Sequence, residues 1–348
     1  YKQTDIWLTN GSDGPNANTE SVFYTRGEAN STMGTSATSG TLTVTGAGQN
    51  TATNETKTAY YVSQFNLKKF LDTKGRDTNN ALTMTTIHIG SNEIDDAYFV
   101  LGSNSISVPA LDLTGFQAIS MNTSQGNAAT STAFSHLVRV VTHDNGYIVG
   151  KGGNGGSADT NASGGHGQDG GDAIELGNNV TLFIENYGTI GGGGGGGGAG
   201  GVTMYNDPAT GAVASSFTNY SGSAGGGGAG FLIGTAGTTA SAITTPSADS
   251  ILIEGGIGAT PDLASTHNSR VPGGKGGDLG SIGYGGNMDA TVTGAGTQSK
   301  WAFSGNGGRP GAAIKGKEYI ASSVYFIGPG GSGRGNIAGD ESFKLDDN

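Results

Sequence analysis

Residues 191–201 consist of eight glycines followed by Ala-Gly-Gly, and this run constrains the fold more than any other stretch of the chain. Glycine loses more backbone freedom on folding than any other residue and has no side chain to bury, so backbone hydrogen bonds must offset the cost. In the polyproline II conformation, with three residues per turn, the backbone groups point outward and can bond sideways to similar helices. The run is therefore either a flexible linker or part of a hydrogen-bonded glycine lattice.

Further glycine runs along the chain favour the lattice. They lie at residues 164–171, 225–230, 273–277, 305–311 and 328–335. Between them are loops with aromatic or charged side chains, at residues 202–221, 259–272 and 287–304. A flexible Gly/Ser linker has no reason to alternate with such loops. We expect a packed scaffold whose interior is residues 191–198, with Gly191, Gly194 and Gly197 as scaffold positions.

The composition also indicates a fold held together by its backbone. Glycine accounts for 68 of the 348 residues, whereas charged residues make up 13% and apolar residues, counted without glycine, 34%. Low charge argues against solvated disorder, and a low apolar content allows only a thin core. Peptide hydrogen bonds must then supply much of the cohesion, as they do in fibrous proteins.

Charge and residue usage exclude several partners and chemistries. The net charge of −11 disfavours nucleic acid and anionic membrane surfaces, which require clustered Lys and Arg. Cysteine is absent, which excludes disulfides, thiolate metal ligands and a cysteine nucleophile. No stretch approaches the ~18 apolar residues that indicate membrane insertion. Because the chain begins with Tyr1, we expect that any leader was removed or never present.

The pattern predicts two regions and a fold class that is mainly β plus non-regular structure. Residues 1–135 form a β-rich amino-terminal region for attachment or assembly, and residues 136–348 form a polyglycine II domain with intervening loops. Strands are expected at residues 41–45, 81–90, 96–101 and 105–108. Residues 59–71 fit an extended stretch followed by a helical turn.

An internal repeat marks the start of the second region. Residues 136–156 contain a β-branched strand, an Asn-Gly turn, an isoleucine and then glycines. Residues 179–198 repeat this order about 42 residues later, and residues 250–258 form a degenerate third pass. Such self-similarity predicts stacked units that cannot bury their faces alone.

These blocks resemble a known family. The stretch Asn-Gly-Tyr-Ile-Val-Gly-Lys-Gly-Gly at 145–153, Asn-Tyr-Gly-Thr-Ile at 186–190 and the glycine run after it resemble the glycine-rich tail-fibre and receptor-binding proteins of tailed bacteriophages. Residues 65–67, 86–90 and 310–316 also resemble that group, so the resemblance covers roughly residues 60–340. In the related tip adhesins, polyglycine II helices pack as a sandwich whose loops bind the host. The resemblance therefore implies a virion protein that attaches to a bacterial surface.

The resemblance places the receptor contacts in the loops between the glycine runs. The candidate contact residues are Tyr205, Phe217, Tyr220, His267, Arg270, Trp301 and Phe303. Tyrosine and tryptophan dominate binding hot spots, but Phe217, Tyr220 and Trp301 have an alternative role, capping the glycine sandwich as a local core. The expected partners are an outer-membrane protein or glycan of the host and other tail-fibre or virion subunits. Assembly with copies of itself is left open.

Several apparent motifs have simpler explanations. Residues 150–155 satisfy G-x-G-x-x-G, but no helix signal follows and so much glycine produces the match by chance. Residues 164–169 match the start of a calcium β-roll repeat in a single copy. The five histidines show no metal spacing and are expected to be solvated or on strand surfaces. The acidic turn at residues 93–96 is expected to be solvated.

No set of residues forms a convincing catalytic or cofactor site, so we expect a protein that is not an enzyme and has no cofactor or metal. The leading hypothesis is an adhesin whose glycine lattice presents loops to the host. The alternative is a structural fibre or capsid-decoration protein whose glycine faces serve assembly alone. A depolymerising tailspike comes third, because no carboxylate pair is convincingly placed.

Overall fold

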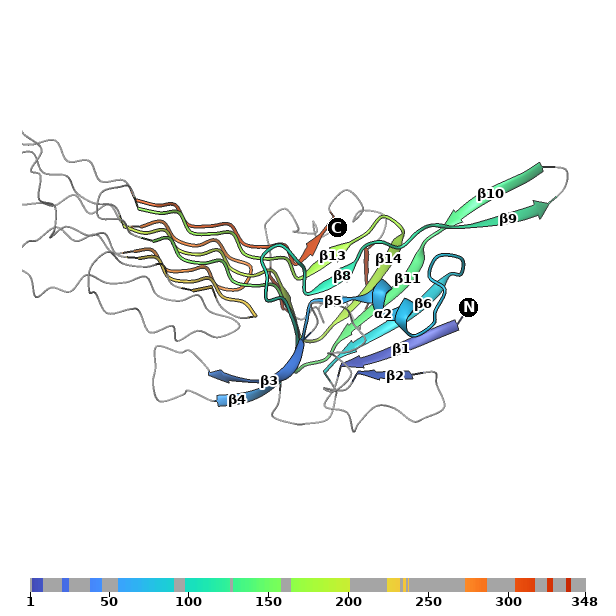
Figure 1. Ribbon diagram of the computed structural model, residues 1–348, viewed down its shortest axis with the longest axis horizontal. Helices are drawn as coiled ribbons and strands as arrows, with labels where there is room; N and C mark the ends of the chain where they lie inside the picture. The colour runs from blue at the N-terminus through green and yellow to red at the C-terminus, as the bar shows by residue number, and fades with distance from the viewer. Residues whose placement is uncertain are drawn as a thin grey trace, which may run out of the picture.

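The computed structural model describes residues 2–8, 21–24, 38–45, 56–90, 98–125, 128–157, 164–200, 224–231, 234–235, 237, 273–286, 304–316, 324–327 and 336–338. Among these residues the protein is mostly β, with one short helix, so the predicted mainly β class is confirmed. Figure 1 shows the strands gathered at one side, which we call the β part, and long extended segments running away from it. We call these segments the glycine bundle: residues 150–157, 164–172, 191–200, 224–231, 234–235 with 237, 273–280, 281–286 and 304–312.

Most strands belong to three sheets. In spatial order, the first contains β17 (Val324–Phe326), β14 (Val180–Asn186), β11 (His136–Thr142), β6 (Thr83–Ile89), β1 (Lys2–Leu8) and β2 (Ser21–Tyr24). The second contains β18 (Asn336–Ala338), β15 (Thr189–Gly191), β12 (Gly146–Val149), β7 (Tyr98–Gly102), β4 (Thr56–Ser63) and β3 (Thr38–Thr45). The third contains β16 (Ile314–Lys315), β13 (Ile174–Leu176), β8 (Leu111–Leu113) and β5 (Phe65–Asn66).

The chain visits the three sheets in the same order on each turn, so it forms a coil of stacked strands. β6, β7 and β8 make one turn, β11, β12 and β13 the next, and β14, β15 and β16 the one after. The strands of successive turns pair in parallel, and the antiparallel pairing in these sheets is the β3–β4 hairpin. Parallel sheets usually have both faces covered, and here the common core covers the inner face of each sheet.

The repeat predicted at residues 136–156 and 179–198 is confirmed as two stacked turns of this coil. β11 pairs in register with β14, and β12 pairs with β15. The third pass at residues 250–258 lies outside the described residues. The sequence pattern did not identify the pairs β6–β7 and β17–β18 as further turns of the coil. The chain between their strands, residues 90–97 and 327–335, is longer than the three residues 143–145 between β11 and β12.

One hydrophobic core lies between the three sheets. Alternation in β14 directs Val180, Leu182 and Ile184 inward, where they are fully buried, and leaves Phe183 and Glu185 on the outer face. The second and third sheets add Val62, Phe99, Leu101, Ile148, Ile190, Phe65, Leu111, Leu113, Ile174, Leu176 and Ile314 to the same cluster. Burial of these side chains is the main favourable contribution to folding of the β part.

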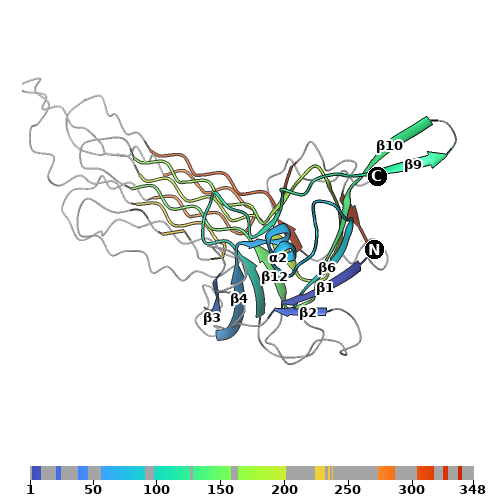
Figure 2. The ribbon, with the colours of Figure 1, turned by 45° about the vertical axis from the view of Figure 1, so that its right-hand side comes forward.

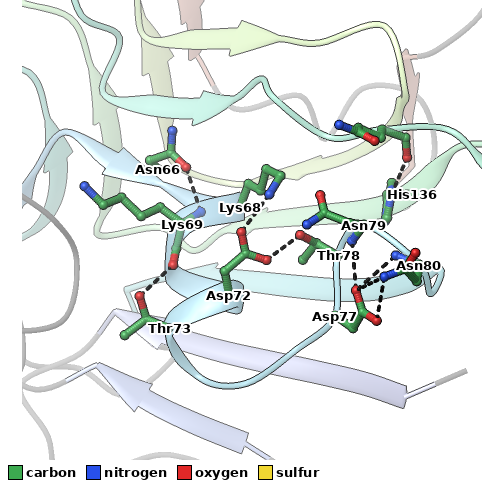
Figure 3. Close-up of polar contacts among 11 residues, drawn as sticks. Asn66, Lys68, Lys69, Asp72, Thr73, Asp77, Thr78, Asn79, Asn80 and His136 are labelled. Carbon is green, nitrogen blue, oxygen red and sulfur yellow. Dashed lines mark hydrogen bonds and ion pairs between the residues drawn. The ribbon is translucent and has the colours of Figure 1, made fainter.

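Helix α2 (Leu67–Thr73) follows β5 and packs onto this core, with Phe70 fully buried. The Asn66 side-chain oxygen accepts a hydrogen bond from the Lys69 N–H at 2.8 Å and so caps the first turn (Figure 3). The extended stretch and helical turn predicted for residues 59–71 are therefore confirmed.

The strands predicted at residues 41–45, 81–90 and 96–101 are confirmed as β3, β6 and β7, but the one at 105–108 is wrong. The Ser105 N–H donates to Ser103 Oγ at 3.1 Å, and the Ser103 hydroxyl donates to the Ser105 carbonyl at 2.7 Å. Local bonds of this kind compete with strand pairing and hold the segment as a turn.

A hairpin that the strand pattern did not predict projects from the β part. β9 (Ile119–Gln125) and β10 (Ala128–Phe134) pair in antiparallel fashion. The hairpin points away from the glycine bundle (Figures 1 and 2). Its serine, threonine and alanine residues lack the apolar alternation that marks a half-buried strand.

Strands from both sides of the predicted boundary between residues 135 and 136 contribute to the β part. β6 pairs with β11, and β7 pairs with β12. The glycine bundle is formed by the chain between β12 and β13 and between β15 and β16. It is thus inserted twice at the same corner of the coil, between the second and third sheets. The division of roles between residues 1–135 and 136–348 stays a prediction.

Candidate functional site

The central segment of the bundle, residues 191–200, is hydrogen-bonded to six neighbouring segments. Its N–H groups donate to 164–172 from Gly193, Gly196 and Ala199, to 224–231 from Gly194 and Gly197, and to 281–286 from Gly195 and Gly198. Its carbonyls accept from 150–157 at Gly191, Gly194 and Gly197, from 273–280 at Gly192, Gly195 and Gly198, and from 304–312 at Gly193, Gly196 and Ala199. Both sets recur every three residues, so each neighbour meets one face of the segment.

Gly191, Gly194 and Gly197, the predicted scaffold residues, share one row of these bonds. Their carbonyl oxygens accept from the N–H groups of Gly150, Gly153 and Gly156 at 3.0, 2.9 and 2.8 Å, respectively. Residues 191–200 are buried along their whole length. The row joins the segment that follows β15 to the one that follows β12, so the two insertions begin side by side.

Between residues 192 and 198, no position of the central segment has room for a Cβ atom. A Cβ atom on Gly192, Gly193 or Gly194 would overlap a carbonyl oxygen, and in each case that oxygen belongs to a different neighbouring segment. Because the hydrogen bonds recur every three residues, these three successive positions cover all sides of the segment, and a larger residue at any of them displaces a neighbour. Close packing of backbones is therefore the reason for the uninterrupted glycine run.

Side chains take over the acceptor role at one edge of the bundle. His166 Nδ1, Asp169 Oδ1 and Asp172 Oδ1 accept from the N–H groups of Asn306, Arg309 and Ala312 at 2.9, 2.7 and 2.9 Å, respectively. We call these three acceptors the edge ladder. Two of them, His166 and Asp169, belong to residues 164–169, which match the start of a calcium β-roll repeat. The spacing H-x-x-D-x-x-D was the signal for the edge ladder, because every third residue of a threefold helix lies on one face.

Asn154 lies on an outer face of the bundle but has a structural partner. Its side-chain oxygen accepts from the Thr235 N–H at 2.9 Å, and the Gly155 N–H donates to the Thr235 carbonyl at 2.8 Å. Lys151, three residues earlier, is half-buried, and this burial lowers the pKa of its ammonium group. A side chain on the outer face of the bundle can therefore bond to a neighbouring segment as well as contact solvent.

The segments of the bundle run in two opposite directions, which places the described residues before and after four of the connections at the same end. Segments 150–157, 191–200 and 281–286 run away from the β part, whereas 164–172, 224–231 and 304–312 run back toward it, as their hydrogen-bond registers require. Segment 273–280 also runs back. The described residues on either side of connections 158–163, 201–223, 238–272 and 287–303 therefore all lie at the end of the bundle remote from the β part, which we call the distal end (Figures 1 and 2).

The predicted contact residues belong to three of these connections. Tyr205, Phe217, Tyr220, His267, Arg270, Trp301 and Phe303 lie outside the described residues. Their connections are attached to the distal end through described residues on both sides, such as Gly200 and Ala224. The structure thus brings the ends of these loops together, although the loops are far apart in sequence.

Phe231 joins the other end of the bundle to the β part. It is 1% exposed, and its N–H donates to the Gly150 carbonyl at 3.0 Å. A Cβ atom on Gly102 of β7 would overlap the Phe231 ring, so the ring lies directly against that strand. This contact fixes the start of the bundle on the second sheet.

The expectation that every histidine is solvated or on a strand surface is wrong for His136 and His143. His136 is fully buried, with Thr83 Oγ1 and the Gln117 carbonyl each 2.9 Å from a ring nitrogen, and burial lowers its pKa. His143 is 6% exposed and its pKa is also lowered by burial. Polar partners at inward positions make burial tolerable, and sequence spacing does not reveal them. His267 lies outside the described residues.

His88 on the outer face of the first sheet pairs with His143. Their Nδ1 and Nε2 atoms are 3.3 Å apart, and the rings stack with centroids 5.5 Å apart. Burial, followed by the neighbouring His143, lowers the pKa of His88 to about 4. Within the described part of the chain, no three His, Asp or Glu side chains are grouped to hold a metal ion. No helix in that part has the length and apolar character needed to cross a membrane.

Comparison with known proteins gives a family. A family model described as phage tail fibre adhesin Gp38 matches residues 60–341. The chain belongs to this family. It is therefore a tail-fibre adhesin of a bacteriophage virion, as the sequence resemblance predicted.

One solved structure similar to this Gp38-family adhesin is that of the gp37-gp38 adhesin tip complex of the bacteriophage S16 long tail fibre. The identity is 20%, the alignment covers 83% of each chain, and the TM-score is 0.34. Comparison with curated proteins gives no match.

Proposed function

We propose that this Gp38-family adhesin attaches the virion to its host through the connections at the distal end of the glycine bundle. The observation that carries the proposal is the direction of the bundle segments. Four separate connections, at 158–163, 201–223, 238–272 and 287–303, start and finish at one end, remote from the β part. Loops on a rigid support are the usual position of binding residues.

We further propose that the bundle segments are polyglycine II helices. Three features support this conformation: hydrogen bonds that recur every three residues, bonds to six neighbours around residues 191–200, and three faces that exclude a Cβ atom. The proposed mechanism is preorganised binding. Backbone bonds fix both ends of each loop, so the loops lose less conformational freedom when they contact the receptor.

The rest of the proposal concerns partners. The receptor is a protein or glycan of the bacterial surface, and the β part connects the adhesin to other tail-fibre subunits, because it lies opposite the distal end. Tyr205, Phe217, Tyr220, His267, Arg270, Trp301 and Phe303 are the proposed contact residues. Binding, not catalysis, is the proposed activity. Whether copies of the chain also associate with one another stays a prediction.

The test measures adsorption of labelled full-length protein to a panel of bacterial strains. Tyr205→Ala, Tyr220→Ala and Trp301→Ala are compared with Tyr325→Ala, which removes an exposed tyrosine from the β part. We expect at least one loop variant to bind about thirtyfold more weakly, since a central aromatic anchor is typically worth ~2 kcal/mol. Melting curves establish that each variant is folded. Binding by no strain would contradict the adhesin role, and full binding by all three loop variants would contradict the assignment to these loops.

A further inference from the structure

The three bonds of the edge ladder lie at different levels of the bundle. Segments 164–172 and 304–312 both run from the distal end toward the β part, so the bond between Asn306 and His166 is the most distal of the three. Asp172 forms the bond nearest the β part. The ladder therefore uses aspartates close to the β part and a histidine at its distal level.

This distal bond lies where two connections enter the bundle. His166 is the third residue after connection 158–163, and Asn306 is the third residue after connection 287–303. The two residues are 140 positions apart in the sequence. A single side chain thus joins the entry points of two connections that are distant along the chain.

One peptide group brings both ends of connection 287–303 to this bond. The peptide between Gly305 and Asn306 accepts from the Gly286 N–H at 3.0 Å through its carbonyl oxygen, and its N–H donates to His166 Nδ1 at 2.9 Å. Gly286 is the last described residue before the connection. Any rotation of this peptide would disturb both ends of the connection, and the bond to the imidazole opposes that rotation.

Other side-chain acceptors of the bundle show which atom of the imidazole matters. His166 Nδ1 is bonded to Cγ, as are the Oδ1 atoms of Asp169 and Asn154. These oxygens accept from the N–H groups of Arg309 and Thr235 at 2.7 and 2.9 Å, respectively. An acceptor one bond beyond Cγ therefore reaches the neighbouring segment at each of these places. Asparagine supplies such an acceptor, whereas leucine has the same branching but places a methyl group there.

We propose that His166 is a positioning residue for receptor attachment, because its Nδ1 atom fixes the peptide at Asn306 and thereby the entry of connection 287–303. It acts through that connection and not by touching the receptor. A loop whose ends are fixed loses less conformational freedom on binding, so the bond should raise the affinity. This inference rests on the proposed function, in which the connections at the distal end contact the host.

The first measurement requires no receptor. Trypsin cleaves after Lys300 in connection 287–303 and after Arg270 in connection 238–272, and the bond of His166 holds only the first of these connections. Because His166 is exposed, leucine can replace it without entering the packed interior. In the full-length His166→Leu protein we expect cleavage after Lys300 to be about three- to tenfold faster than in the wild type, with cleavage after Arg270 unchanged. Mass spectrometry of the fragments distinguishes the two sites.

The second measurement is adsorption to a bacterial strain that binds the wild-type protein. His166→Leu should adsorb about three- to tenfold more weakly. His166→Asn keeps an acceptor in the place of Nδ1 and should restore both adsorption and the cleavage rate to about the wild-type values. Asp169→Leu removes a bond of the same kind one turn nearer the β part, so it should weaken adsorption less. Melting curves establish that the variants are folded.

The outcomes separate the positioning role from the proposed function. Unchanged cleavage after Lys300 in folded His166→Leu protein would overturn the positioning role, whether or not any strain binds. If the wild type binds and His166→Leu binds equally well, only this role is overturned. Equal weakening by His166→Leu and Asp169→Leu would also overturn it, because a general loss of stability would then explain both. If no strain binds the wild type, the proposed function fails and the role in attachment fails with it.

Discussion

The β part and the glycine bundle are held together by different interactions, although the same chain passes between them repeatedly. In the β part, inward side chains such as Leu182 and Ile148 fill a common core. In the bundle, the central segment buries no side chain larger than Ala199 and instead uses its N–H and carbonyl groups. The first region tolerates changes that conserve side-chain volume, whereas the second tolerates almost no added atom at an inward position.

This difference explains why the bundle can be inserted between two strands of the coil. β12 and β15 lie in register, so the segments that follow them, beginning at Gly150 and Gly191, start side by side and can bond at once. The β part thus sets the spacing from which the bundle grows. Phe231, packed against Gly102, secures a returning segment to the same sheet.

The largest expected effect comes from placing a side chain inside the bundle. Gly194→Val would drive Cβ into the carbonyl oxygens of Gly277 and Asp278 and add two methyl groups. We expect the bundle not to form, because the cost involves several neighbouring backbones and exceeds the ~5–15 kcal/mol that stabilises a typical protein. The measurement is the soluble yield and the melting curve of the purified variant.

Gly285→Ala is the matched control for this change. It also replaces a bundle glycine, but at a position where the added Cβ meets only ordinary contacts. We expect its melting temperature to stay within a few degrees of the wild type, as for a surface substitution of about 0.5 kcal/mol. A soluble Gly194→Val protein that melts like Gly285→Ala would refute the closed packing of the central segment.

The parts of this fold that sequence could predict are those with local signals. Residues 81–90 were predicted as the strand that is β6, and the strand-turn-glycine order identified two turns of the coil, including β11 and β14, before their pairing was seen. The hairpin β9–β10 was not predicted, and a strand was wrongly predicted in the turn at Ser103–Val108. In both cases residue propensity alone does not distinguish exposed Ser/Thr strands from turns. The common core of the three sheets depends on contacts between distant residues, and no local pattern encodes them.

Of the candidate site, the sequence predicted only the positions of the connecting loops and the interior position of residues 191–198. The edge ladder was missed, because a periodic His-Asp-Asp spacing has meaning only once segment 304–312 lies beside it.

Acid should lower the stability of the β part through the buried histidine pair His88–His143, and the central segment of the bundle contains no titratable side chain. The pKa of His88 is near 6.5 in the unfolded chain and about 4 in the fold, because of burial and the adjacent His143. Above pH 6.5 neither state binds this proton; between pH 6.5 and 4 the unfolded state binds it more strongly. Stability should therefore fall as pH drops through this range, by at most about 3 kcal/mol from His88.

The measurement is the melting temperature at pH 7 and at pH 4.5, for the wild type and for His88→Gln. Glutamine keeps a polar side chain at this position but does not titrate, so the variant should lose less stability on acidification. Burial by itself would raise the pKa of Glu185, which lies near this pair, but the hydrogen bonds from Arg139 and Tyr187 outweigh burial and lower it. Equal losses in the two proteins would show that the histidine pair does not govern the acid response.

The smallest expected effect sharpens the comparison at the edge of the bundle, where a side chain replaces a backbone acceptor. Asp169 Oδ1 accepts from the Arg309 N–H at 2.7 Å. Asp169→Leu should cost about 1–2 kcal/mol, because the Arg309 N–H loses its acceptor at an exposed position where water replaces it only in part. Asp169→Asn keeps an oxygen acceptor in the same place and should cost less than about 0.5 kcal/mol. Chemical denaturation of both variants measures the difference. If Asp169→Asn is as destabilised as Asp169→Leu, the negative charge and not the acceptor atom stabilises this edge, and the edge ladder would then be an electrostatic feature that high salt should weaken.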